Sequence, residues 1–176
     1  MTVYNRTREK SSAWVAEYGG AQQNTPRAAA EGAEFVMACV GNDHDLRSVV
    51  LGDDGALEGM SDGSVFVDHT TVSALVTDEL FLAAKSNGID FVDAPISGGQ
   101  AGAENGVLSI MCGGAQPAYD RAEPVMAAYS RICRRIGESG AGQKTKMCNQ
   151  IAIAGLVQGL SAVSYTHLTL PTKLAV

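Results

Sequence analysis

The chain has 176 residues, of which 45% are hydrophobic and 18% charged, a balance typical of a soluble α/β domain with one sizeable core. Its formal net charge of −6 leaves no basic surface for nucleic acid, and no basic amphipathic stretch indicates a membrane partner. No signal peptide and no apolar run of membrane-spanning length is expected, which predicts a cytoplasmic protein. The three histidines and four cysteines show no ligand spacing, so no metal site is expected.

Apolar runs alternate with helical patterns along most of the chain. Strands are predicted at Thr2–Tyr4, Glu34–Val40, Val65–Val67 and Ile89–Val92, followed by Val107–Met111 and Arg131–Ile136. Helices are predicted from an N-cap at Thr7 to Tyr18, from Pro26, around Asp45–Val50 and around Ser73–Asn87. Strands that alternate with helices at this spacing predict a doubly wound α/β fold, in which helices cover both faces of a parallel sheet.

The segment Asp93–Gly99 (DAPISGG) carries the strongest sign of a binding site. It predicts a strand that ends in a proline-containing turn, followed by the hydroxyl of Ser97 and by Gly98 and Gly99. Backbone N–H groups beside a serine suit a small carboxylate, because fixed dipoles replace the water that the anion loses. The same pattern also fits a glycine-rich turn between a strand and a helix in any α/β protein.

A second segment, Gly140–Gln150 (GAGQKTKMCNQ), predicts a glycine-rich entry into a long helix. Residues three and four apart share a helix face, so Lys146, Asn149 and Gln150 are expected to point the same way. The following turns are apolar almost all round, as in a buried helix. An ammonium at the mouth of such a helix needs a polar partner or a function, whereas Lys144 is expected to be a solvated charge.

Together these two segments resemble the β-hydroxyacid dehydrogenase family, which includes 3-hydroxyisobutyrate dehydrogenase and tartronate semialdehyde reductase. The resemblance covers Val3 to about Ala162 and implies a Rossmann-like sheet that binds a nicotinamide dinucleotide. It implies hydride transfer between NADP(H) and a small β-hydroxyacid or semialdehyde acid, with Lys146 as the catalytic proton donor and acceptor. The implied substrate-binding residues are Ser97, Gly98, Gly99, Asn149 and Gln150.

The cofactor-binding residues expected at the ends of the strands follow from the same resemblance. No acidic residue follows the first strand, and Arg6 can instead pair with a 2′-phosphate, which favours NADP over NAD. Val40 and Gly41 resemble the family's cofactor loop. The segment Asp68–Thr71 resembles the family's Asp-x-Ser-Thr turn, whose last threonine lies near the nicotinamide. The candidate cofactor-binding residues are Asn5, Arg6, Thr7, Val40, Gly41 and Thr71.

The resemblance also implies that the chain is a fragment. The glycine-rich phosphate loop is absent, and the strand before it would lie between Val3 and the strand Phe35–Val40. Residues 1–139 are expected to form a partial NADP-binding domain, and residues 140–163 the start of a helix that leads to an absent all-α domain. Residues 164–176, in which Pro171 breaks the helix, are expected to be a non-native tail. The fragment is expected to be inactive and its parent enzyme a homo-oligomer with a small carboxylate substrate.

Two other functions remain open at this point. The fold could serve as a non-catalytic binding or dimerisation module, although such a module is expected to lose the lysine. It could also reduce imines, with a different proton donor and an altered carboxylate nest. The presence of Lys146 together with Ser97, Gly98 and Gly99 favours the hydroxyacid dehydrogenase over both.

Overall fold

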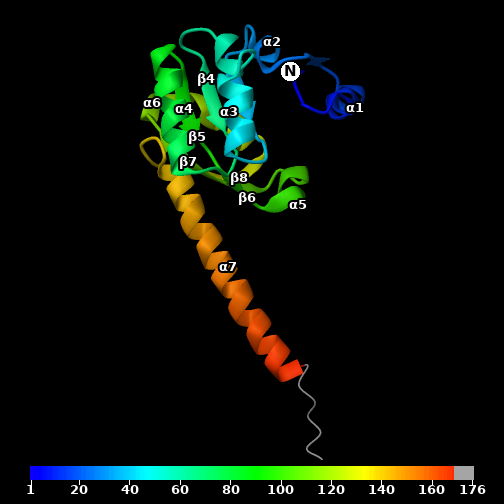
Figure 1. Cartoon of the computed structure of the whole chain (residues 1–176), viewed down its shortest axis with the longest axis vertical. Coiled ribbons are helices and arrows are strands. Elements are labelled where there is room, and N and C mark those ends of the chain that lie inside the picture. The colour runs from blue at the N-terminus through cyan, green and yellow to red at the C-terminus, as the bar shows by residue number, and fades with distance from the viewer. Residues whose placement is uncertain (169–176) are drawn as a thin grey trace, which may run out of the picture.

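The structure is a computed structural model and describes residues 1–168 (Figure 1). Its elements in chain order are β1 (Thr2–Val3), α1 (Arg8–Tyr18), β2 (Ala21–Gln22), α2 (Pro26–Ala30), β3 (Phe35–Ala38), α3 (Asp43–Leu51), the 3₁₀ turn η1 (Ala56–Glu58), β4 (Val65–Asp68), α4 (Ala74–Ser86), β5 (Asp90–Asp93), β6 (Ile96–Ser97), α5 (Gly99–Glu104), β7 (Leu108–Gly114), α6 (Gln116–Ala127), β8 (Ser130–Gly137) and α7 (Ala141–Leu168). The predicted strands and helices are confirmed, with bounds shifted by a few residues. The chain therefore has the predicted Rossmann-like α/β fold.

The main sheet has six strands, of which β3, β4 and β5 run parallel in that order. The sheet continues through β7, which is antiparallel to β5 and β6 and parallel to β8. The expectation of a wholly parallel sheet is therefore wrong beyond β5. The chain returns from β6 to β7 through the short segment 98–107, and a parallel crossover needs a dozen or more residues.

Alternate residues of the parallel strands face two different layers of helices. Phe66 and Phe91 stack with ring centroids 6.0 Å apart and belong to the core under α3 and α4. Val67 and Val92 belong to a second core on the other face, where α6 packs with the buried side chain of Met126. Because strand side chains alternate between faces, these two cores cover both sides of β4 and β5. The loops that follow the strands then lie at the carboxyl edge of the sheet.

The sheet is divided near its N-terminal strands. β1 and β2 pair only with each other and lie to one side of the domain (Figure 1). A cavity of about 890 Å³ separates them from the main sheet, and Val3, Tyr4, Phe35 and Val36 contribute to its lining. Within residues 1–168, β3 has no strand partner other than β4. The cavity lies between β1 and β3, which are not paired with each other.

Helix α7 begins against the domain and then projects far beyond it (Figure 1). Every side chain from Ile151 to His167 is exposed. The helix continues through Ser164 to Leu168, and Pro171, the residue expected to break it, lies outside the described residues. The span 141–167 is long and apolar enough to cross a membrane, which corrects the expectation that no such run exists. One such helix says little about a membrane, because core helices of soluble proteins have the same composition.

Candidate functional site

The loops that follow β3 and β4 are tied together at the carboxyl edge of the sheet. The amide of Val40 donates to Thr70 Oγ1 at 3.1 Å, and the amide of His69 donates to the Ala38 carbonyl at 2.8 Å. The candidate cofactor-binding residues Gly41 and Thr71 come next in these loops, and both are exposed. The structure thus brings two of the predicted cofactor segments side by side.

Arg6 reaches the same edge from the end of β1. Its Nη1 lies 2.8 Å from Oδ1 of Asp45, in the first turn of α3, which follows Gly41 closely in the chain. Asn42 Nδ2 donates to the other oxygen of this carboxylate at 3.1 Å and so holds Asp45 in place. The Arg6 side chain is 80% exposed, and the ion pair therefore leaves most of the guanidinium open to solvent.

The turn that carries Arg6 is closed by its two neighbours. Asn5 Oδ1 accepts a hydrogen bond from the Thr7 amide at 2.8 Å, the pattern of an Asx turn. Thr7 occupies the N-cap position of α1, but its side chain makes no capping bond, so the prediction of a threonine cap is wrong. Its main-chain carbonyl accepts from the Lys10 amide instead, at 3.0 Å. Asn5 thus shapes the backbone around Arg6.

The candidate carboxylate-binding turn lies between β6 and α5. Ser97 is half-buried at the end of β6 and pairs in register with Ser109 of β7. Gly98 and Gly99 follow with φ of 137° and 61°, a region that favours glycine, and both are exposed. The backbone conformation therefore requires these glycines, and it presents main chain without side chains beside a hydroxyl.

Lys146 is buried on α7, with only 7% of its surface exposed. Within residues 1–168 its ammonium has no hydrogen-bond or ion-pair partner, and burial lowers the pKa of Lys146. Lys144 is exposed, as predicted. The Lys146 Nζ is not one of the buried atoms that lack a partner, so the aliphatic part of Lys146 is packed while its ammonium stays open to solvent and to a ligand.

Of the two amides predicted beside Lys146, one is buried with it. Asn149 is half-buried, and its Oδ1 is buried with no hydrogen-bond partner in the described part of the chain. Gln150 is exposed, so the structure does not bring it to the buried side. The reason is local, since α7 leaves the domain at this point and Ile151 is already 75% exposed.

Asp93 fixes the start of α7 to the end of β5. Its carboxylate accepts from the amides of Gly140 at 2.7 Å and Gln143 at 2.9 Å, as an N-cap side chain does, but from another element. Burial raises the pKa of Asp93, and these hydrogen bonds oppose the rise. Gly142 allows the close approach, because a Cβ there would overlap the Met111 carbonyl oxygen and lie 2.6 Å from that of Asp93. The sequence pattern predicted the strand end here but not the cap.

Gln143 joins the same turn of α7 to the loop after β4. Its side chain is fully buried, with 0% exposed. Nε2 donates to the Thr70 carbonyl, and Oε1 accepts from the Val72 amide at 3.4 Å. These two bonds lie on either side of Thr71 in the chain. Sequence reasoning missed Gln143, because nothing in the pattern separates a buried glutamine from an exposed one.

Two further buried side chains, Asp68 and His69, lie at the end of β4, where this loop begins. Neither of them was assigned a role from the sequence. Asp68 pairs in register with Asp93; burial raises the pKa of Asp68 to about 7, and its Oδ2 has no partner within the described range. His69 Nδ1 lies 2.7 Å from the Ala94 carbonyl and Nε2 lies 2.8 Å from the Tyr129 hydroxyl, while burial lowers the pKa of His69. The imidazole is therefore neutral, with Nδ1 donating to the carbonyl and Nε2 accepting from the hydroxyl.

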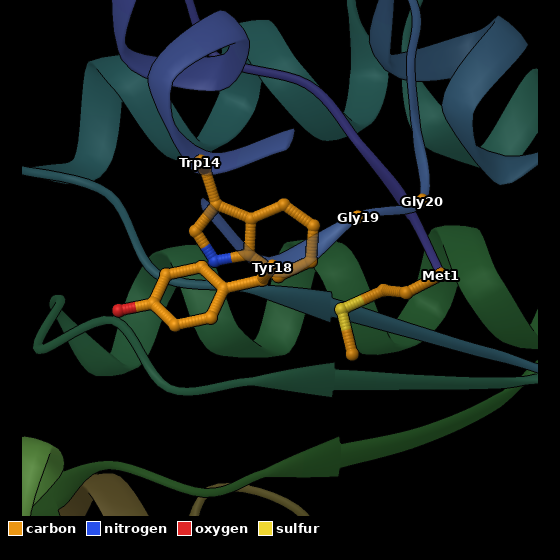
Figure 2. A pocket seen from close by; sticks show the side chains of 5 residues that line it. All are labelled: Met1, Trp14, Tyr18, Gly19 and Gly20. Atoms are coloured by element: carbon orange, nitrogen blue, oxygen red, sulfur yellow. The ribbon is translucent and has the colours of Figure 1, made fainter. Parts of the chain in front are cut away.

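A separate hollow of about 340 Å³ lies at the other end of β1. Figure 2 shows the rings of Trp14 and Tyr18 beside the side chain of Met1, next to Gly19 and Gly20. These residues stand at the amino ends of β1 and β2, whereas the candidate site residues follow carboxyl ends, so the two places are distinct. Across residues 1–168, no group of three or more metal-ligating side chains is close enough to hold an ion.

Comparison with known proteins gives consistent matches. Residues 1–137 match the family described as the NAD binding domain of 6-phosphogluconate dehydrogenase. An uncharacterized oxidoreductase of Shewanella frigidimarina is 55% identical over 161 residues, and a 3-hydroxyisobutyrate dehydrogenase of Pseudomonas aeruginosa is 32% identical over 145 residues. These matches cover 92% and 82% of the chain, which spans only about half the length of these relatives, 55% and 49%. The structure of Mycobacterium tuberculosis 3-hydroxyisobutyrate dehydrogenase with L-serine gives a TM-score of 0.81 at 27% identity, covering 94% of this chain and 57% of that one.

Proposed function

This chain belongs to the family of the NAD-binding domain of 6-phosphogluconate dehydrogenase, alongside 3-hydroxyisobutyrate dehydrogenase-like oxidoreductases, and we propose that it serves NADP(H)-dependent conversion of a small β-hydroxyacid. The predicted resemblance to the β-hydroxyacid dehydrogenases is thereby confirmed. Proteins of this family are oxidoreductases that use a nicotinamide dinucleotide. Because the chain spans about half the length of its relatives, the proposal concerns the protein that carries it.

The observation that carries this proposal is the unpaired ammonium of Lys146. A buried lysine whose pKa is lowered exchanges a proton with a substrate oxygen more readily than a solvated one. Lys146 gives its proton to the carbonyl oxygen of a semialdehyde during reduction and takes it from the hydroxyl during oxidation. The buried Oδ1 of Asn149, which lacks a partner among residues 1–168, holds that hydroxyl in orientation. Gln150, being exposed, is a weaker candidate for this role.

The substrate carboxylate binds at the turn after β6. The Ser97 hydroxyl and the amides of Gly98 and Gly99 donate to it, since charge-assisted bonds to fixed donors are short and strong. The proposed substrate therefore carries a carboxylate.

The residues present fit a dinucleotide with a 2′-phosphate. Arg6 offers an open guanidinium at the end of β1, supported by the turn of Asn5 and Thr7. Gly41 would offer a backbone surface without a side chain, and Thr71 would lie toward the nicotinamide, since Val40 holds its loop through Thr70 Oγ1. When bound, the dinucleotide supplies or accepts the hydride. Arg6 would hold the 2′-phosphate in exchange for part of its contact with Asp45.

Replacing Lys146 by alanine tests the proposal, with Lys144→Ala as the matched control on the same helix. Loss of a general acid lowers kcat by about 10²–10⁴-fold. The assay is the reduction of semialdehyde acids by NADPH in the full-length protein that carries this chain, here and in all turnover measurements below. NADPH affinity is titrated separately to show that the cofactor still binds. We expect Lys146→Ala to lose turnover and Lys144→Ala to keep it. Near-parental kcat for Lys146→Ala would contradict the role, and cofactor binding without turnover in the unsubstituted protein would favour a non-catalytic module.

A further inference from the structure

We propose that Gln143 is a positioning residue that holds Lys146 in register with the loop that carries Thr71. The inference rests on the proposed function of Lys146 and concerns a residue that touches neither substrate nor cofactor. It follows from the way Gln143 is bonded on two sides, through its side chain and through its backbone.

The side chain of Gln143 spans the loop after β4. Its amide group reaches the carbonyl of Thr70 with Nε2 and the N–H of Val72 with Oε1, so that Thr71 is enclosed between two bonded neighbours. Within residues 1–168 the amide of Val72 has no other acceptor. A buried main-chain amide that loses its acceptor costs free energy, so Gln143 stabilises one particular course of this loop.

The backbone of Gln143 is bonded to a different element. Its N–H donates to Asp93 Oδ2 at 2.9 Å, at the carboxyl end of β5 and four residues before Ser97. One residue therefore links the strand that leads to the substrate turn with the loop on the cofactor side. Lys146 lies three residues further along the same helix, about 4.5 Å along the axis. Gln143 therefore fixes the position of Lys146 relative to both the substrate turn and the loop that carries Thr71.

Packing alone does not account for a glutamine here. A buried amide is unfavourable unless it is hydrogen-bonded, and leucine fills a similar volume without that requirement. Thr70 has two further anchors, because its amide donates to Asp68 Oδ1 at 2.9 Å and its Oγ1 accepts from Val40. Gln143 is distinctive in that it connects this anchored loop to the helix of Lys146.

Two substitutions and one matched control site test the inference. Gln143→Leu removes both side-chain bonds, while Gln143→Glu keeps the acceptor for Val72 and loses the donor to Thr70 unless it is protonated. The control is Gln116, an exposed glutamine on α6 that donates to Asp120 at 2.7 Å, changed to Leu and to Glu. The readouts are amide hydrogen exchange at Val72 and the separate values of kcat and KM.

For Gln143→Leu we expect exchange at Val72 to accelerate about 10-fold or more, because the amide loses its partner. We expect kcat to fall about 10–100-fold with KM changed less than about 3-fold, since a misplaced proton donor slows the chemical step without removing a substrate contact. The Gln116 variants should match the unsubstituted protein in both readouts.

Gln143→Glu gives a signature that a merely structural role would not show. Burial raises the pKa of a carboxyl group, and the protonated form restores the donor to Thr70. Relative to the unsubstituted protein at each pH, kcat of Gln143→Glu should therefore recover as the pH is lowered, whereas Gln116→Glu should show no such step.

Unchanged exchange at Val72, or a fall in kcat that is not larger than in the Gln116 variants, would overturn the inference. Should Gln143→Leu fail to fold, Gln143→Glu carries the same two readouts. If the unsubstituted protein turns over no semialdehyde acid, the proposed function fails, and exchange at Val72 alone still decides whether Gln143 holds the loop.

Discussion

The two halves of the candidate site are built in different ways. On the reacting side, Asp93 and Gln143 are fully buried and join the end of β5, the loop after β4 and the start of α7 by hydrogen bonds, and Lys146 on the same helix is almost wholly buried. On the phosphate side, Arg6 is 80% exposed and is held by one ion pair to Asp45. Exposed ion pairs contribute about 0–1 kcal/mol, so Arg6 can move to meet a ligand, whereas the groups around Lys146 cannot. Proton transfer needs fixed geometry, and recognition of a phosphate tolerates motion.

The largest expected effect compares two glycines of α7. In Gly142→Ala the new Cβ meets the carbonyl oxygens of Met111 and Asp93, which are backbone atoms and cannot swing away. We expect a loss of about 2–3 kcal/mol in the free energy of unfolding. Gly155 has open space around it, so Gly155→Ala should stabilise the helix by about 0.5–1 kcal/mol. Urea unfolding of both variants measures this, and changes of the same sign would contradict the close packing at Gly142.

An intermediate effect is expected from the buried carboxyl of Asp68. Its pKa is about 7 in the folded protein against about 3.9 when unfolded, so the folded state retains a proton that the unfolded state releases. This contribution to stability is present below about pH 4 and is lost as the pH rises through 7, at up to about 1.4 kcal/mol per pH unit.

Asp68→Asn removes this titration. Between pH 5 and 7 the unsubstituted protein should lose about 2 kcal/mol of unfolding free energy that the variant keeps. The difference between the two proteins therefore shifts by that amount in favour of the variant. Burial also raises the pKa of Asp93. In both proteins this residue should therefore leave a smaller dependence of the free energy of unfolding on pH. Denaturant unfolding at several pH values measures the difference, and parallel pH curves would show that Asp68 is ionised at neutral pH.

The smallest effect on stability is expected for Arg6, on the exposed phosphate side of the site. Arg6→Ala should change the free energy of unfolding by less than about 0.5 kcal/mol. It should weaken NADPH binding about 10–100-fold and NADH binding hardly at all, because only NADPH loses a charge-assisted phosphate bond. Arg47→Ala is the control, since Arg47 makes a similar ion pair with Glu79 at 2.7 Å. Equal losses for the two cofactors would assign Arg6 a structural role.

Sequence reasoning reached the parts of the molecule that local pattern determines. The ends of β4 and β5 and the glycine turn at Gly98 follow from short segments with few alternative conformations. The apolar turns after Lys146 predict a buried helix, but in the structure they are exposed, so the burial of Lys146 comes from the domain and not from that pattern. Gln143 and Asp93 act across elements, since their partners lie 73 and 47 residues away, and no local pattern records such a contact. The antiparallel direction of β7 was not predicted for the same reason, because the direction of a strand depends on which strand it pairs with.

Helix α6 was missed for a different reason. It contains Pro124 in its interior, where proline normally argues against a helix. Its buried residues Ala118, Ala122 and Met126 recur every four positions, however, and form one face against the sheet. Burial of that face outweighs the lost backbone bond, a balance that only the tertiary structure makes visible.

Because Gln143 bonds the start of α7 to two other elements, a tilt of the helix about that residue would move the two ends of the helix by different amounts. From there the helix extends about 36 Å to His167, whereas Lys146 lies only about 4.5 Å along it. A sideways displacement of about 3 Å at the far end therefore tilts Lys146 by only about 0.4 Å, within the tolerance of about 0.5 Å that a catalytic group allows. For such a tilt, the displacement of Lys146 is roughly one eighth of the displacement at the outer end of the helix.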